Sequence, residues 1–231
     1  GEPFKLDPYH SKFWRKASAG NWEPETFAVL DQHLDKDHDY LDIGAWIGPT
    51  VLYGARKARR VMCFEPDPVA FRHLAWNLEL NRLTNVSAFS VALSSGFGIA
   101  RMASFGGEAG DSMTSLLADG DHGSDVLTVG WDAFAAQADL SRVSLVKMDI
   151  EGAEFTVLPQ LLPWLKEHRP ALFLSTHASF LDEGERAAKM AELAEQLSFY
   201  GDCREDGRGT DGFAAMSAPR ALSGFPTYLF T

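Results

Sequence analysis

The stretch that decides the fold of this chain reads Asp42-Ile43-Gly44-Ala45-Trp46-Ile47-Gly48. It follows the short apolar run Tyr40-Leu41 and ends where a helix can begin. The next apolar run, residues 61–64, is followed directly by an acidic residue, Glu65. A strand, a glycine turn, a helix, a second strand and a carboxylate form the opening unit of nucleotide-binding α/β folds. The glycines matter because a residue without a Cβ atom lets backbone N–H groups approach a ligand closely.

The spacing of the glycines indicates which ligand the turn suits. A dinucleotide fingerprint reads G-x-G-x-x-G, and its second glycine lies against the pyrophosphate. Trp46 occupies that position here, so it blocks the pyrophosphate seat of an NAD-dependent oxidoreductase, which is the alternative enzyme class. Glu65 is suitably placed for a ribose diol. A cofactor with a ribose and an amino-acid end but no pyrophosphate, S-adenosylmethionine (SAM), fits this pattern better.

Length and composition narrow the class of protein. The chain has 231 residues, of which 45 % are hydrophobic, which suits one large α/β domain better than two small ones. Its net charge of −11 disfavours a nucleic-acid partner, because phosphate binding needs a basic face. No apolar run approaches the ~20 residues of a membrane span, and no secretory signal pattern is visible. Two cysteines, Cys63 and Cys203, imply no disulfide framework. We therefore expect a cytoplasmic protein with no membrane partner.

Apolar segments alternate with helix-length segments along most of the chain. The predicted strands are residues 40–43, 61–64, 86–93, 145–149 and 171–176. This alternation predicts a parallel sheet with right-handed crossovers.

The remaining segments give more local expectations. Residues 1–37 are predicted to form a helical, aromatic-rich segment that could cover the cofactor as a lid. The Gly- and Ser-rich insertion 94–130 is expected to face the substrate and to contain a hairpin of residues 99–103 and 126–129. Two strand-like ends, 213–216 and 227–230, would add an antiparallel hairpin at the edge of the sheet.

A second group of polar residues follows the predicted strand 145–149. The sequence there is Lys147-Met148-Asp149-Ile150-Glu151-Gly152-Ala153-Glu154. Ligands of open α/β sheets bind at the carboxyl ends of the strands, so Asp149 and Glu151 are candidate catalytic residues. Glu154 is equally explained as an acidic residue at a helix N-terminus. His177 follows the next strand, and it is our first choice of base because the unperturbed pKa of histidine is near neutrality.

A metal site is an alternative use of the same residues. Asp149, Glu151 and His177 offer oxygen and nitrogen donors that suit a divalent ion. Because the sequence shows no tight ligand spacing, we predict no metal.

Three motifs together resemble the FkbM-type SAM-dependent methyltransferases: residues 42–48, residues 64–66 and residues 147–154. The similarity extends over roughly residues 38–180. It implies an α/β, single-domain class I methyltransferase (Rossmann-like) fold over residues 38–231, with a seven-stranded, mostly parallel sheet and an antiparallel C-terminal strand. It also implies methylation of a hydroxyl on a small molecule or sugar. An amine acceptor and a SAM-binding domain without catalysis are the alternatives.

The resemblance also assigns roles to residues. Asp42, Gly44 and Gly48 would bracket the methionine end of SAM, Glu65 would hold the ribose hydroxyls, and Asp149 would lie near the amino group or the methyl. The resemblance places three further residues at the cofactor: Ala45 and Pro66 from these motifs, and Ala92 from the intermediate segment 92–94, which also resembles the family. The chain departs from the family at Trp46, where a small polar residue is usual, and at His177, near which many relatives carry a glutamate.

Overall fold

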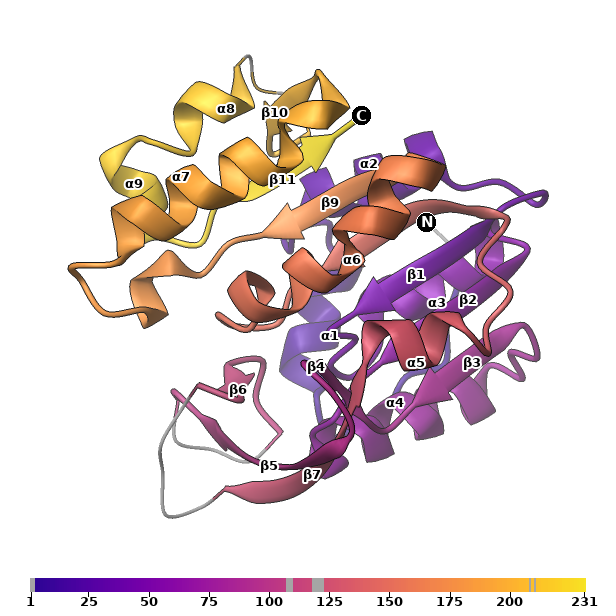
Figure 1. Cartoon of the computed structure of the whole chain (residues 1–231). Helices are drawn as coiled ribbons and strands as arrows, with labels where there is room; N and C mark the ends of the chain where they lie inside the picture. Colours follow the sequence, from indigo (N-terminus) through magenta and orange to yellow (C-terminus); the bar gives the residue numbers. More distant parts are fainter. Residues whose placement is uncertain (1–2, 107–109, 118–122, 208, 210) are drawn as a thin grey trace.

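The protein is built around a seven-stranded sheet, seen in a computed structural model that describes residues 3–106, 110–117, 123–207, 209 and 211–231 (Figure 1). The strands lie in the order β10 (Cys203–Glu205), β11 (Thr227–Phe230), β9 (Ala171–Ser175), β8 (Val143–Met148), β1 (Asp39–Ile43), β2 (Arg60–Phe64) and β3 (Val86–Phe89). Within this sheet, β11 runs antiparallel to both of its neighbours and the other described pairs are parallel. The predicted mostly parallel, seven-stranded α/β sheet is therefore confirmed.

The strand order reverses beside β1. The chain builds outward from β1 to β2 and β3, and it later returns to add β8 and β9 on the other side of β1. Loops that leave the carboxyl ends of β1 and β8 consequently diverge, which opens a crevice between them. The fold places its ligand site at this edge before any side chain is considered.

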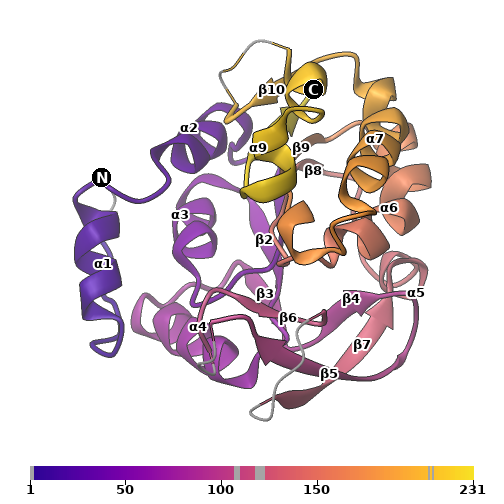
Figure 2. The same cartoon turned by 90° about the vertical axis from the view of Figure 1, so that its left-hand side faces the viewer.

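Helices cover both faces of the sheet (Figure 2). One layer contains α2 (Pro24–His33), α3 (Pro49–Lys57) and α4 (Pro68–Leu80), and the other contains α5 (Trp131–Ala135), α6 (Glu154–His168) and α7 (Arg186–Leu197). Because both faces are covered, all five residues of β1 are buried. Leu41 and Ile43 pack in the core beside α6, whereas Tyr40 packs beside α2 and α3.

The remaining elements lie outside the main sheet and its two helix layers. They are α1 (Ser11–Ser18), β4 (Ala92–Ser94), β5 (Gly98–Ser104), β6 (Thr114–Ser115), β7 (Ser124–Gly130), η1 (Ala178–Phe180), η2 (Ser198–Tyr200), α8 (Gly212–Ala215) and α9 (Pro219–Ser223). Among the described helices, none combines the length and the apolar character that crossing a lipid bilayer requires.

The insertion forms a small second sheet. The predicted single strand 86–93 is wrong, because the main-sheet strand β3 ends at Phe89 and β4 starts at Ala92 in a different sheet. The second sheet has the order β4-β7-β5-β6, and β4 pairs in parallel with β7. The predicted pairing of the two segments is confirmed, since β5 and β7 pair antiparallel with Ile99 opposite Leu127, although β6 lies between them in the chain and pairs with the other edge of β5. Parts of the insertion, residues 107–109 and 118–122, lie outside the described residues.

The C-terminal prediction is wrong in two details. Residues 213–215 of the predicted strand 213–216 lie in helix α8. Asp211 caps this helix, because its Oδ1 atom accepts a hydrogen bond from the Ala214 nitrogen at 3.1 Å. The partner of β11 is instead β10, a three-residue strand that lies within the predicted loop 201–212. Residues 208 and 210 of that loop are not described. Since β10 takes the edge, the antiparallel strand β11 is the second strand of the sheet. A three-residue strand carries too little alternation to be detected from sequence.

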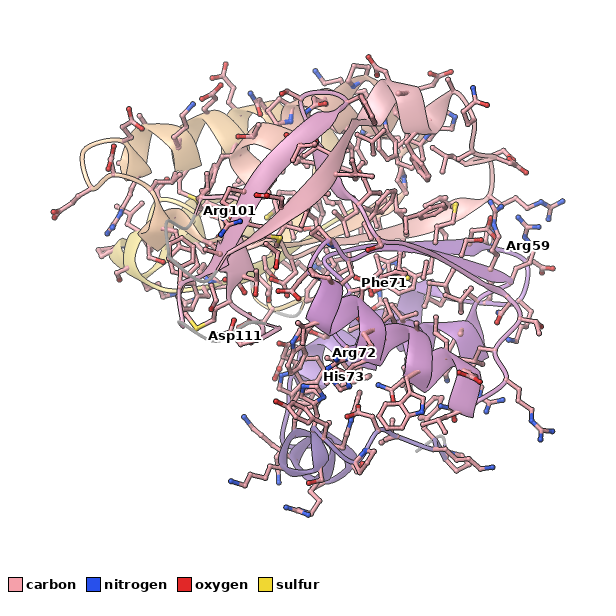
Figure 3. The ribbon with its side chains drawn as sticks, turned by 90° about the horizontal axis from the view of Figure 1, so that it is seen from below. Arg59, Phe71, Arg72, His73, Arg101 and Asp111 are labelled. Carbon is pink, nitrogen blue, oxygen red and sulfur yellow. The ribbon has the colours of Figure 1, made fainter. Side chains whose placement is uncertain are left out.

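A buried carboxylate fastens the N-terminal segment to α4. Asp7 is 1 % exposed and accepts hydrogen bonds from Trp14 Nε1 (2.8 Å), Asn77 Nδ2 (3.1 Å) and the backbone nitrogen of His10 (3.0 Å). His73 of α4, labelled in Figure 3, adds its Nδ1 atom at 3.5 Å. These contacts hold α1 beside α4, at one side of the crevice.

Replacement of this carboxylate is expected to destabilise the fold. Asp7→Ala leaves several buried donors without an acceptor, so the free energy of unfolding should fall by on the order of 3 kcal/mol. Urea denaturation followed by circular dichroism measures this change. The matched control is Asp125→Ala, which removes an exposed ion pair with Arg101 and should change stability by less than about 1 kcal/mol. Equal effects of the two substitutions would contradict a stabilising role for Asp7.

Candidate functional site

A cavity of about 610 Å³ opens at the carboxyl ends of the central strands. This volume is within the range of about 300–1,000 Å³ that is typical of small-molecule sites. Its wall combines the turn after β1, the residues after β2 and β8, the N-terminal segment and the insertion. The sequence-predicted residues that line it are Gly44, Ala45, Glu65, Pro66, Ala92, Asp149, Glu151 and His177. The described lining does not include Asp42 or Gly48.

The glycine turn allows the tips of β1 and β8 to touch. Gly44 has φ +92°, and a Cβ atom there would lie 1.8 Å from the carbonyl oxygen of Asp149. Its N–H group and that of Ala45 both donate to the Phe64 carbonyl oxygen, at 3.0 Å. These N–H groups are therefore already bonded within the protein. Gly44 serves the close packing of two strand ends, and this contact carries Asp149 to the cavity.

Asp42 lies behind the cavity wall. It is fully buried, and its Oδ2 atom accepts hydrogen bonds from Thr50 Oγ1 (2.6 Å) and Tyr40 Oη (2.9 Å). Its Oδ1 atom lies 3.8 Å from Lys147 Nζ. Burial raises the pKa of Asp42, although the charge of Lys147 opposes the shift. Asp42 thus positions Thr50 and Lys147, which do line the cavity.

Glu65 is held in place by two backbone donors. The Trp46 nitrogen donates to Oε2 (2.7 Å) and the Asp67 nitrogen donates to Oε1 (2.8 Å). Burial raises the pKa of Glu65 to about 7, although both hydrogen bonds act to lower it. Each carboxylate oxygen keeps a second lone pair, so the group can still accept hydrogen bonds from a diol.

Both the backbone and the indole ring of Trp46 are held in place by neighbouring residues. Its backbone has a left-handed φ of 48°, and its indole Nε1 donates to the Gly110 carbonyl oxygen at 3.0 Å. The indole also packs edge-on against Phe13 of α1, with ring centroids 4.6 Å apart. Trp46 therefore joins the turn after β1 to both the insertion and the N-terminal segment. Sequence reasoning identified it as an obstacle to a pyrophosphate and as a departure from the family pattern, but not as this link.

A second charged cluster lies at the tips of β8 and β9. His177 Nε2 is 3.6 Å from Asp149 Oδ1 and 3.4 Å from Glu151 Oε2. On the other side of the ring, Nδ1 is 3.3 Å from Glu154 Oε1. Glu154 is fully buried and also accepts hydrogen bonds from the backbone nitrogens of Gly152 (2.9 Å) and His177 (2.6 Å). The structure thus brings together all three predicted catalytic residues, and Glu154 holds His177 in position.

The expectation of an ordinary pKa for His177 is wrong. Burial alone would lower the pKa of this imidazole, but Glu154, Asp149 and Glu151 outweigh burial and raise it to about 9. His177 is therefore protonated at neutral pH and cannot accept a proton there. Burial raises the pKa of Glu151 to about 7, which makes this carboxylate the proton acceptor best matched to neutral pH.

The buried Lys147 and the partly exposed Asp149 form an ion pair in the wall of the cavity. Lys147 Nζ lies 3.2 Å from Asp149 Oδ2. Burial by itself would lower the pKa of Lys147, but Asp149, Asp42 and Glu23 raise it. Burial would raise the pKa of Asp149, but Lys147 and His177 lower it, so Asp149 stays ionised. Asp149 therefore presents one oxygen to Lys147 and the other to His177.

The donor atoms of the alternative metal site lie close together, but nothing in their arrangement points to a particular ion. Asp149, Glu151 and His177 offer donor atoms that all lie within 4.8 Å of one another. The pKa of His177 favours the imidazolium, which cannot ligate a metal. The absence of a metal stays a prediction.

Several lining residues were not assigned to the site individually by sequence reasoning, which expected only that the N-terminal segment with Trp22 could form a lid and that the insertion faces the substrate. Glu23 and Trp22 reach the cavity from the start of α2, and Phe225 reaches it from the loop before β11. Asp111, labelled in Figure 3, joins them from the insertion and accepts a hydrogen bond from Ser104 Oγ at 2.6 Å. No motif marks these residues, because only the tertiary fold brings their segments to the same crevice.

The raised pKa of His177 can be measured directly. Histidine ¹⁵N NMR should give a pKa of about 9 for this ring, and Glu154→Gln should lower it because the largest raising influence is removed. The folded-state pKa exceeds the ordinary value of 6.5, so protonation stabilises the fold below about pH 6.5 and this contribution is lost as the pH rises through about 9. Glu192→Gln on α7, which removes an exposed carboxylate, is the control. An unchanged pKa in Glu154→Gln would contradict this account.

Comparison with known proteins agrees with this geometry. A model of the methyltransferase FkbM domain matches residues 42–202. Methyltransferase sdnD of Sordaria araneosa is 31 % identical to the chain in an alignment covering 51 % of the chain and 58 % of that protein. The crystal structure of methyltransferase FkbM from Methylobacillus flagellatus KT superposes with a TM-score of 0.52 at 17 % identity, covering 85 % of this chain and 44 % of that one.

The two comparisons with individual proteins each show less than the family model does. The chain spans about half the length of both relatives, at 58 % and 44 %. At 17 % identity the structural likeness supports the fold alone. The family model covers both motifs that line the cavity, the turn after β1 and the segment after β8. The chain belongs to the FkbM family of methyltransferases, whose cofactor is S-adenosylmethionine.

Proposed function

We propose that this chain transfers a methyl group from SAM to a hydroxyl group of a small molecule or sugar. The observation that carries the proposal is the layout of one cavity. Glu65, a carboxylate with free acceptor capacity, lies on its wall after β2, and the Asp149–Glu151–His177 cluster lies on its wall after β8 and β9. One wall suits the sugar of the cofactor, and the other suits the reacting groups.

The residues present fit the cofactor. Glu65 would accept hydrogen bonds from the ribose hydroxyls, and the tight turn at Gly44 and Ala45 would lie against the methionine portion. Pro66 and Ala92 continue the wall beside Glu65. Asp42 and Gly48 would contribute from behind this wall, Asp42 through Thr50 and Lys147 and Gly48 by starting α3.

Alignment and proton removal are the tasks left to the protein. SAM supplies, when bound, an electrophilic methyl group on a sulfonium, and holding two reactants in line can lower a barrier by ~7–11 kcal/mol. We assign the proton acceptor to Glu151, because the pKa of about 7 makes it available near neutral pH. His177, as an imidazolium, forms ion pairs within the cluster and balances the charges of Asp149 and Glu151.

The acceptor side has an apolar border. Phe225 and Phe180 lie 5.3 Å and 5.8 Å from the His177 ring, measured between ring centroids. Phe225 is 53 % exposed and lines the cavity, so a small organic acceptor can pack against it. An amine acceptor stays the alternative, since an unprotonated amine needs less help from a base.

Three further features belong to the proposal. The N-terminal segment 1–37, of which residues 3–37 are described, acts as a lid, which its lining residues Phe13 and Trp22 support. The net charge of −11 supports a small-molecule acceptor over a nucleic acid. The few cysteines support a cytoplasmic location.

Cofactor binding should depend on Glu65. Glu65→Gln removes the charge that strengthens hydrogen bonds from the ribose, so S-adenosylhomocysteine should bind about 10- to 100-fold more weakly in calorimetry. Glu79→Gln on the exposed side of α4 is the control and should bind normally. The melting temperature of the ligand-free variant reports whether the turn itself has been lost. Two results would argue against the proposal. One is normal binding of S-adenosylhomocysteine by a folded Glu65→Gln variant, and the other is binding of NADH but not S-adenosylhomocysteine by the wild type.

Turnover should depend on Glu151. The protein is incubated with a cell extract and tritiated-methyl SAM, the labelled product is identified, and kcat is measured with that acceptor. Glu151→Gln should lower kcat by roughly 10²–10⁴-fold and leave the affinity for S-adenosylhomocysteine unchanged. Wild-type kcat should rise with pH through about 7, because the ionised carboxylate accepts the proton.

Two other results would change the assignment. An equal loss in the surface control Glu183→Gln would show that Glu151 has no special role. Bound cofactor with no transfer to any acceptor would favour a SAM-binding domain without catalysis.

A further inference from the structure

The motifs of the FkbM family assign no role to Glu23, a charged residue that lines the cavity. It precedes α2 and lies outside residues 42–202, the part of the chain that the FkbM domain model matches. Its side chain nevertheless lines the same cavity as Gly44 and Asp149. The N-terminal segment therefore delivers a carboxylate to a site whose other walls come from the matched region.

The position of Glu23 is held by local structure. Its backbone adopts a left-handed conformation, with φ 42° and ψ 54°, immediately before Pro24. Such a conformation is unfavourable for a residue with a Cβ atom and persists where surrounding contacts enforce it. Those contacts include the buried Thr26, whose Oγ1 donates to Glu23 Oε2 at 3.0 Å and whose nitrogen donates to the Glu23 carbonyl at 3.0 Å. One carboxylate oxygen is thereby fixed.

The surroundings of Glu23 carry more negative than positive charge. The charges that act on it most are those of Asp149, Lys147 and Asp42. Lys147 is already shared between Asp149, at 3.2 Å, and Asp42, at 3.8 Å. Burial, followed by the charge of Asp149, raises the pKa of Glu23. Lys147 is thus influenced by three carboxylates, and although His177 also faces Asp149, a cation beside Glu23 would reduce the excess of negative charge.

The whole cavity shows the same excess. Among the described lining residues, seven carboxylate side chains stand against two lysines and His177. A ligand with positive charge is the one that such a cavity favours.

Asp149 separates this region from the reacting groups. Its Oδ1 atom faces His177, whereas its Oδ2 atom faces Lys147. The charges of both members of this pair act on Glu23, that of Asp149 more than that of Lys147. The sulfonium of SAM has no N–H donor, but its α-ammonium group has three, and a fixed carboxylate oxygen accepts such donors well.

We propose that Glu23 binds the α-ammonium group of the cofactor, so that the N-terminal segment recognises the amino-acid end of SAM. This assignment rests on the proposed function. It makes the segment part of the cofactor site as well as a cover, and it lets the chain distinguish SAM and S-adenosylhomocysteine from nucleosides that lack the amino acid. No chemical step is involved, because the carboxylate only accepts hydrogen bonds.

Two ligands separate this role from a general one. S-adenosylhomocysteine carries the ammonium, whereas 5′-methylthioadenosine has the same adenosine and sulfur but no amino-acid end. Calorimetry should show that Glu23→Gln weakens the first by about 10- to 100-fold and changes the second by less than about twofold. Glutamine keeps an oxygen for the Thr26 hydroxyl, so the melting temperature of the ligand-free variant should be unchanged.

The control is Glu25→Gln, which removes the same charge from the same turn and the same cavity. Its effect on S-adenosylhomocysteine should be several-fold smaller than that of Glu23→Gln. If Glu23→Gln lowers the melting temperature, Glu23→Asp, which keeps the charge but shortens the side chain, should still weaken only the ligand with the ammonium.

The outcomes against the proposal are distinct. Equal weakening of both ligands, no weakening of either, or equal effects at positions 23 and 25 would overturn the role of Glu23 while leaving SAM binding intact. Wild-type protein that binds neither ligand would overturn the proposed function, and the role of Glu23 with it.

Discussion

The close contact between the carboxyl ends of β1 and β8 is the constraint on which the site depends. At Gly44 even a single Cβ atom would overlap the Asp149 carbonyl oxygen, at 1.8 Å. Because the two strand ends touch, the residues that follow them must turn away in opposite directions. The turn after β1 leads to Glu65 through Trp46, and the segment after β8 leads to Glu151 and His177. One backbone contact thus separates the two functional walls of the cavity.

Buried charge is organised around that contact. Lys147 lies beneath it and is neutralised by Asp149 and Asp42, and Asp42 is in turn held by the hydroxyl groups of Tyr40 and Thr50. Burying a charged group is unfavourable unless it has a partner. Removal of any member would therefore leave another charged group without its partner in the low-dielectric interior. The network keeps Asp149 ionised at the centre of the cavity.

Proton affinities in the site follow from the same arrangement. Glu154 is buried beside the imidazole of His177 and receives the backbone N–H group of that residue. This carboxylate, together with Asp149 and Glu151, overcomes the effect of burial and keeps the histidine charged. Burial acts on Glu151 in the opposite sense, by favouring its neutral form. Acid and base roles in the cluster are therefore set by burial and by neighbouring charges, not by residue type.

The amino-acid sequence by itself determined the class of fold, the parallel direction of the central strands and the two motifs that line the cavity. These depend on local patterns: an apolar run, a glycine turn, and carboxylates at the ends of strands 61–64 and 145–149. The tertiary structure alone decided that Asp42 is a buried support, that His177 is charged, and that β10 pairs with β11. It also brought Glu23, Asp111 and Phe225 to the cavity from segments far apart in the chain. The physical reason is that burial, charge and strand pairing depend on neighbours in space, which a single sequence does not list.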